Sequence, residues 1–184
     1  FTTVIPQNPV EADVLAVYGE TLAAGGAGPL VVWKKHRYAW LPLFAQPVPG
    51  AAPALSVEMM RSEFRADSLL LTNASGTALA ATLRLRGLPG GAAPRWLTVS
   101  AMPWTDTATF VPVAAALPAT RPVAGVYAIS LPAGLTRKVW FTVDSSRLAA
   151  GTWRGGIEVT AGGQRVRVPF TLRVAPFSMA RPRL

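Results

Sequence analysis

The chain has 184 residues, of which 51% are hydrophobic and only 15% are charged, a composition that excludes an intrinsically disordered chain. It contains no cysteine, which excludes disulfide bonds and thiolate metal sites. The formal net charge is +9, and no run reaches the roughly 20 apolar residues of a membrane-spanning helix, so we expect no membrane span.

The first fifty residues differ in character from the rest. Residues 1–9 carry neither the basic nor the apolar region of a signal peptide, and the chain starts with Phe, so we expect a processed or excised part of a longer protein. Two strand-like pieces follow, at Val14 to Tyr18 and Leu30 to Trp33. We predict an N-terminal strand and loop segment over 1–50, which packs on the sandwich or ends a preceding domain, and a β-sandwich over 51–184.

A basic and aromatic run follows the second piece. It comprises Lys34, Lys35, His36 and Arg37, with Trp33, Tyr38 and Trp40 beside it. Such interleaving is compatible with stacking on bases or sugars, although a basic turn beside a hydrophobic strand is the more frequent meaning. His36 is the only histidine, and its neighbours in sequence are cations with no orienting carboxylate, so we assign it no catalytic role.

From Leu55 onward, alternating runs separated by Gly, Pro, Asn and Ser predict seven or more short strands. The runs are Leu69 to Leu71, Ala81 to Leu85, Trp96 to Ser100, Thr109 to Val113, Val126 to Leu131, Val139 to Val143, Trp153 to Thr160 and Val166 to Val174. Asn73 to Gly76 predicts a hairpin between the first two. No segment shows helical periodicity, so we predict an all-β, two-layer antiparallel β-sandwich of the immunoglobulin-like kind.

The last two runs form the clearest hairpin. Gly162 and Gly163 stand between them and supply the positive φ values of a tight turn. Pro169 has no N–H for a ladder, which predicts an edge strand or a bulge. Arginines occupy every second position of this strand and of an earlier one, namely Arg84, Arg86, Arg165, Arg167 and Arg173. That spacing indicates the solvent face of strands, so we predict no nucleic-acid partner.

The sequence offers no set of residues for catalysis, for a metal or for a cofactor. Glu58 and Glu63 are the nearest pair of carboxylates, but Arg61 and Arg65 beside them indicate structural salt bridges. The glycine-rich stretches lack the spacing of phosphate-binding loops. Asn73, which opens an Asn-Ala-Ser triplet, is interpreted as a turn residue rather than a glycosylation acceptor.

Six tryptophans are notable in a chain of this size. Trp140 and Trp153 sit within predicted strands, where core packing or an interdomain contact is expected. Trp33, Trp40 and Trp104 are less constrained, and they are our candidates for carbohydrate binding, with core packing as the commoner alternative.

Three segments near the end carry a family resemblance: 138–144, 148–159 with its Gly151-Thr152-Trp153-Arg154-Gly155 run, and 166–179 with its Val166-Arg167-Val168-Pro169-Phe170 run. They resemble the close of the N-terminal β-sandwich in multidomain bacterial glycoside hydrolases of the β-N-acetylgalactosaminidase type and their uncharacterised relatives, with Trp153 in place of the usual tyrosine. Arg61-Ser62-Glu63-Phe64 also looks like part of that module. In that family a barrel following the sandwich carries the catalytic carboxylates, so no catalytic residue is transferred to this chain.

The resemblance implies a noncatalytic accessory module of an exported carbohydrate-active protein, periplasmic or extracellular, which packs against a neighbouring domain of the same polypeptide. Two alternatives stay open. One is a carbohydrate-binding module that grips a polysaccharide through exposed tryptophans. The other is a structural or chaperone-like envelope sandwich that offers strand edges to protein partners.

Overall fold

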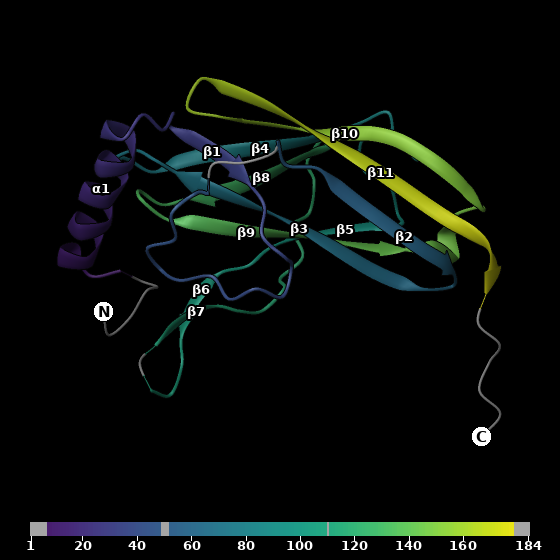
Figure 1. Ribbon diagram of the computed structural model, residues 1–184, viewed down its shortest axis with the longest axis horizontal. Helices are drawn as coiled ribbons and strands as arrows, with labels where there is room; N and C mark the ends of the chain where they lie inside the picture. Colours follow the sequence, from purple (N-terminus) through teal and green to yellow (C-terminus); the bar gives the residue numbers. More distant parts are fainter. Residues whose placement is uncertain (1–6, 49–51, 110, 179–184) are drawn as a thin grey trace.

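The computed structural model describes residues 7–48, 52–109 and 111–178, which form a two-layer β-sandwich with one helix at its end (Figure 1). The predicted immunoglobulin-like, all-β sandwich is confirmed. Sheet A contains, in spatial order, β1 (Leu30–Trp33), β3 (Phe64–Asn73), β9 (Thr136–Asp144) and β5 (Leu97–Ala101). Sheet B contains β2 (Leu55–Arg61), β11 (Gln164–Ser178), β10 (Gly151–Ala161), β4 (Leu79–Arg86) and β8 (Val126–Leu131).

Three smaller elements complete the described chain. A separate hairpin joins β6 (Trp104–Asp106) to β7 (Pro112–Ala114), and a 3-10 turn covers Ser145–Arg147. Strand pairing within both sheets is antiparallel except for β2 and β11, which run parallel. No helix among the described residues is long and apolar enough to cross a membrane.

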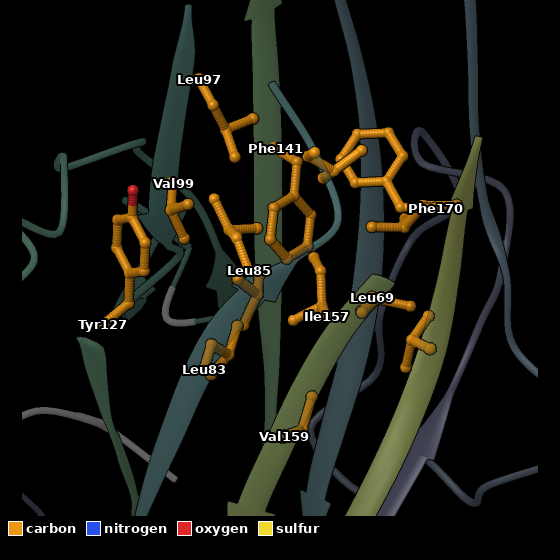
Figure 2. Packing of buried hydrophobic residues seen from close by; sticks show 14 of the residues in the cluster. Leu69, Leu83, Leu85, Leu97, Val99, Tyr127, Phe141, Ile157, Val159 and Phe170 are labelled. Carbon is orange, nitrogen blue, oxygen red and sulfur yellow. The ribbon is translucent and has the colours of Figure 1, made fainter. Parts of the chain in front are cut away.

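The main core fills the space between the two sheets. Figure 2 shows side chains from β3, β5 and β9 of sheet A meeting side chains from β4, β8, β10 and β11 of sheet B. The predicted alternation is visible on β9, where Val139, Phe141 and Val143 are fully buried. Full burial of such a side chain stabilises the fold by about 1.5–3 kcal/mol. Most of the buried hydrophobic residues belong to this core, so it supplies most of the hydrophobic free energy of folding.

The predicted terminal hairpin is confirmed. β10 and β11 pair from Gly151↔Val174 to Ala161↔Gln164, and the turn glycines have φ values of +55° at Gly162 and +76° at Gly163. Pro169 lies in the half of β11 that has only β10 beside it, because the ladder with β2 starts one residue later at Phe170↔Leu55. Pro169 therefore takes no part in the ladder with β2, which agrees with the predicted edge position.

The predicted hairpin between Leu69 to Leu71 and Ala81 to Leu85 is wrong. The two strands belong to different sheets, so Asn73 to Gly76 carries the chain from one layer to the other. The Asn73 side chain is fully buried, and its Nδ2 donates to the carbonyls of Thr77, Leu131 and Pro132 at 2.7, 3.0 and 3.2 Å. Asn73 is therefore not available for glycosylation in this conformation, because its amide nitrogen is inaccessible.

Residues Pro9–Ala24 form a helix, α1. Two predictions are therefore wrong: that the chain has no helix, and that Val14 to Tyr18 is a strand. A capping box starts the helix: Glu11 N donates to Asn8 Oδ1 at 2.9 Å, and Asn8 N donates to Glu11 Oε2 at 3.3 Å. The helix carries apolar residues on two faces: Val10, Val14 and Val17 share an exposed face, whereas the buried face consists of Glu11, Leu15 and Gly19.

The described N-terminal stretch, residues 7–48, is packed on the sandwich. β1 pairs with β3 from Leu30↔Asn73 to Trp33↔Leu70, and α1 approaches the turns before β4 and β9 so closely that a Cβ at Gly19 or Gly134 would overlap backbone atoms. Figure 1 shows the helix against one end of the sandwich. A domain boundary near residue 50 stays a prediction.

Candidate functional site

The outer face of sheet A is not a solvent face over its whole area. The segment 41–45 and helix α1 cover part of it, and a second apolar cluster fills the space between. Its buried members are Leu15, Trp33, Leu41, Leu43, Ala45, Leu70, Trp104 and Leu135. The strand β3 is therefore buried on both faces along Leu69 to Asn73.

Two of the three tryptophans singled out for carbohydrate binding belong to this cluster, which agrees with the core-packing alternative. Trp33 is 5% exposed and its Nε1 donates to Thr72 Oγ1 at 2.8 Å. Trp104 is 1% exposed and its Nε1 donates to Thr136 O at 2.9 Å. Both indoles have their polar atom satisfied inside the protein, which is how buried tryptophans are accommodated. Neither presents a ring to a ligand in this conformation.

Trp40, the third candidate, is 64% exposed and lies beside other aromatic residues. Tyr38 is 71% exposed, Phe64 is 69% exposed, and Trp140 is partly exposed on the outer face of β9. The Tyr38 and Trp140 ring centroids are 5.8 Å apart, tilted by 51°. We call Tyr38, Trp40, Phe64 and Trp140 the aromatic surface. A role of Trp40 in carbohydrate binding stays a prediction.

A buried lysine holds the loop that carries Tyr38 and Trp40. Lys138 points outward from β9 beneath this loop, and its Nζ donates to Arg37 O at 3.2 Å and to Ala39 O at 2.9 Å. Burial, together with the nearby charge of Lys35, lowers the pKa of Lys138 below its ordinary value. The loop also closes a turn in which Ala39 N donates to His36 O at 2.8 Å. These contacts hold the backbone of the loop that carries the two exposed rings above sheet A.

Two hollows flank the Tyr38 ring. One, of about 290 Å³, is lined by Tyr38, Phe64 and Trp140 together with Arg37 and Arg65. The other, of about 340 Å³, has Tyr38, Trp40 and Trp140 on its wall and Lys138 at its base. The guanidinium carbon of Arg37 lies 5.0 Å from the Tyr38 ring centroid, which is a cation–π distance. The arrangement offers flat apolar rings with guanidinium donors beside them.

The carboxylates Glu58 and Glu63 line one cavity of about 450 Å³ beside β2, and each of them lies near an arginine. Glu63 Oε1 accepts from Arg65 Nε at 2.5 Å, and Glu63 Oε2 accepts from Met60 N at 2.8 Å. Burial favours the protonated form of Glu63, but these hydrogen bonds and the charge of Arg65 outweigh it and lower the pKa. Glu63 therefore stays ionised and is unsuited to donate a proton.

The partner of Glu58 differs from the expected one. Its Oε2 lies 3.9 Å from Arg173 Nη1 on the neighbouring strand β11, whereas Arg61 was expected from its place in the sequence. Each glutamate has an arginine partner, in close contact for Glu63 and at a longer distance for the exposed Glu58.

His36 is exposed, and its ring lies 5.6 Å from the Tyr38 ring. Its Nδ1 accepts a long hydrogen bond of 3.4 Å from Tyr38 N. Over the described ranges, no three side chains of His, Cys, Asp or Glu come together as metal ligands would.

The aromatic surface was visible in the sequence only in part. Tyr38 and Trp40 stand out as aromatics in a basic run, but Phe64 and Trp140 are far away in the chain and join them only because β3 and β9 pair, with Phe64 opposite Asp144 and Trp140 opposite Ser68. Trp140 could be assigned to the same surface as Phe64 only from the pairing register of β3 and β9, because both side chains point away from the core.

No protein-family model matches the chain, and no curated protein matches it. Among solved structures, it is similar to a family 123 glycoside hydrolase from Clostridium perfringens, with 12% identity and a TM-score of 0.45 over 67% of this chain and 23% of that one. It is also similar to the ASH/PapD-like domain 7 of human CEP192, with 11% identity and a TM-score of 0.45 over 82% and 87% of the two chains.

A third similar structure is the CsuC–CsuE chaperone and tip adhesion subunit complex of Acinetobacter baumannii, with 12% identity and a TM-score of 0.40 over 80% of this chain and 53% of that one. The chain spans about a quarter of the length of the glycoside hydrolase. These likenesses concern the fold, and they place a glycoside hydrolase among the distant structural neighbours of the β-sandwich.

Proposed function

We propose that this chain is a noncatalytic accessory β-sandwich module of an exported, glycoside-hydrolase-like protein, and that its aromatic surface packs against a neighbouring domain of the same polypeptide. The observation that carries the proposal is the exposure of three large aromatic side chains, Tyr38, Trp40 and Phe64, on one side of sheet A. Soluble domains rarely expose such side chains together unless the patch meets a partner.

The composition of the patch supports a protein partner. Tyr, Trp, Phe and Arg are the residues enriched at the centres of protein interfaces, and Arg37 and Arg65 lie among the aromatic rings. The backbone of the loop that carries Tyr38 and Trp40 is held in place before any partner arrives, because Lys138 ties it to β9. A preorganised loop loses little backbone entropy on docking.

The test compares one variant in two contexts. Replacing Trp40 and Phe64 by serine in the isolated module changes exposed positions only, so its unfolding free energy stays within about 0.5 kcal/mol of wild type. In the complete protein the same pair destabilises the module by about 2 kcal/mol or more, because docked aromatics are removed. Equal effects in both contexts, measured by chemical unfolding, contradict the proposal.

A second candidate is carbohydrate binding at the same surface. The specific observation is the hollow walled by Tyr38, Trp40 and Trp140, where a sugar ring could stack while Arg37 donates to its hydroxyls. Calorimetric titration with soluble polysaccharides tests it, with Trp40→Ala as the probe variant. Phe177→Ala is the matched control, since Phe177 is 61% exposed and lines the separate cavity beside Glu58. Absence of binding heat for every glycan refutes this candidate.

A further inference from the structure

The outer face of sheet B, on the side of the sandwich opposite the aromatic surface, carries a concentration of arginines. Strands β4, β10 and β11 lie side by side in this sheet, and their outward positions are occupied by Arg84, Arg86, Arg154, Arg165, Arg167 and Arg173. All six are exposed, which confirms the predicted solvent face for the five that the spacing indicated. We call them the arginine face.

The charges on this face are only partly balanced. Glu58 and Glu158 are the acidic residues among the outward positions of the described strands β2, β4, β10 and β11, which leaves a net charge of +4 from six arginines and two glutamates. Glu158 lies 3.8 Å from Arg86 and 3.9 Å from Arg165, and Glu58 lies 3.9 Å from Arg173. These separations are too long for hydrogen bonds, so the guanidinium donors remain available.

Arg84, Arg154 and Arg167 form no ion pair with any described residue, and strand register places them beside two neighbouring outward positions of β10, Gly156 and Glu158. Gly156 sits between Arg154 and Glu158 on β10, and Arg86 lies opposite it on β4. Arg84 and Arg167 lie on either side of Glu158, one on β4 and one on β11. The Arg167 side chain leans over Gly156, with its Nε 3.8 Å from where a Cβ would stand.

Glycine is required here by the sheet itself, because a Cβ would lie 2.9 Å from Val168 O. The outer surface of sheet B therefore carries no side chain at Gly156, and the ring of Pro169 lies opposite this position on β11. We call this part of the surface the floor. Arg86 and Arg154 lie directly beside this floor, Arg84 and Arg167 lie diagonally across from Gly156, and Glu158 is the one carboxylate that borders it. An anionic group resting on it would meet guanidinium forks from several sides, and such forks bind carboxylates in a bidentate manner.

We propose that the arginine face binds a carboxylate-bearing polysaccharide. Threonines lie among the arginines at Thr82, Thr152, Thr160 and Thr171, and their hydroxyls match the hydroxyls of sugar rings. Single-stranded nucleic acid is less well matched, because the outward positions of 82–86, 152–160 and 165–173 hold no aromatic residue on which bases could stack. A bilayer is less well matched too, because the same positions offer no large apolar side chain for insertion.

The proposal goes beyond the docking role of the aromatic surface and is independent of it. Together the two faces would let the module hold its neighbouring domain on one sheet and an acidic glycan on the other.

The test uses polygalacturonate as the probe, with neutral dextran, a DNA oligonucleotide and vesicles containing an anionic lipid as comparisons. Binding to polygalacturonate is measured by affinity electrophoresis at several salt concentrations, and we expect the affinity to fall as salt rises. The variant pair Arg84→Gln and Arg167→Gln weakens binding about tenfold. Neither arginine takes part in an ion pair with the described residues, so the thermal unfolding of this variant should match that of wild type.

The control pair Arg95→Gln and Arg121→Gln removes the same charge from exposed loop positions and leaves binding within about twofold of wild type. Absence of binding to polygalacturonate overturns the proposal, as does equal weakening in the control, which indicates attraction by net charge alone. Tighter binding to DNA or to vesicles through the same arginines also overturns it. Trp40→Ser leaves polygalacturonate binding unchanged, so failure of the docking proposal is distinguishable from failure of this one.

Discussion

Replacing Lys138 by methionine removes the charged donor beneath the aromatic loop while keeping a side chain of similar length. The Nζ of Lys138 donates two hydrogen bonds, to Arg37 O and Ala39 O, and no other described side chain donates to these carbonyls. A hydrogen bond from a charged group is worth about 1.5–3 kcal/mol, and water recovers part of that loss at the freed carbonyls. We therefore expect opening of residues 36–41 to become easier by about 2 kcal/mol.

That free energy corresponds to roughly 30-fold faster amide hydrogen exchange in the loop. The Ala39 amide is the most direct reporter, since its hydrogen bond to His36 O closes the turn. The global unfolding free energy changes less, because the methionine also relieves the burial penalty that lowers the pKa of Lys138. Mass-spectrometric exchange at neutral pH measures both quantities.

Lys35→Met is the matched control for this experiment. Lys35 lies next to the same loop but donates no side-chain hydrogen bond to a described residue, so its replacement leaves exchange at residues 36–41 within about twofold of wild type. Unchanged exchange in Lys138→Met, or an equal rise in the control, refutes the assignment of Lys138 as the anchor of the aromatic loop.

Three further predictions concern the fold that carries the two faces. Gly134→Ala lowers the unfolding free energy by about 2 kcal/mol or more, because Gly134 has a φ of +64° and a Cβ there overlaps Leu15 O of α1. In the control Gly163→Ala, where φ is +76° but no atom lies within 4 Å of the added carbon, urea unfolding shows a smaller loss of about 1 kcal/mol. Asn73→Asp places a carboxylate against three backbone carbonyls and costs about 3 kcal/mol, and a loss below about 1 kcal/mol in the same assay contradicts the hydrogen bonds assigned to Asn73. Because the pKa of Glu63 is lowered in the folded state, the unfolded state takes up a proton first as the pH falls through 4.5, and the unfolding free energy declines on acidification. The decline is shallower in Glu63→Gln. Identical pH profiles of unfolding for the two proteins contradict the pairing with Arg65.

The parts of the fold that could be predicted are those specified by local pattern. The β10–β11 hairpin needs only alternating apolar residues on both sides of Gly162 and Gly163, and the structure has this pairing. Helix α1 was missed because apolar residues occupy its exposed face as well as its buried face, so that no single helical stripe stands out in the sequence. The local signal was present in Asn8, Pro9 and Glu11, which together start the helix.

The features that could not be predicted depend on which layer covers which. β3 contains a continuous apolar run and β4 alternates, and neither pattern reveals that the two strands belong to different sheets. Trp33 and Trp40 are seven positions apart in the same aromatic run, yet one is buried and the other exposed, because segment 41–45 folds back over only part of sheet A. In that segment Leu41, Leu43 and Ala45 are buried in alternation with Pro42 and Phe44, but all five residues are apolar, so the sequence does not show which side forms the second core.

The central claim is that the aromatic surface meets a neighbouring domain. Hydrogen exchange of the isolated module and of the complete protein tests it most directly, with residues 36–41 and 64–66 as reporters. We predict that amides in these two segments exchange at least about tenfold more slowly in the complete protein, while those of the arginine face on β10 do not change. Equal exchange of residues 36–41 and 64–66 in the two proteins would contradict the account.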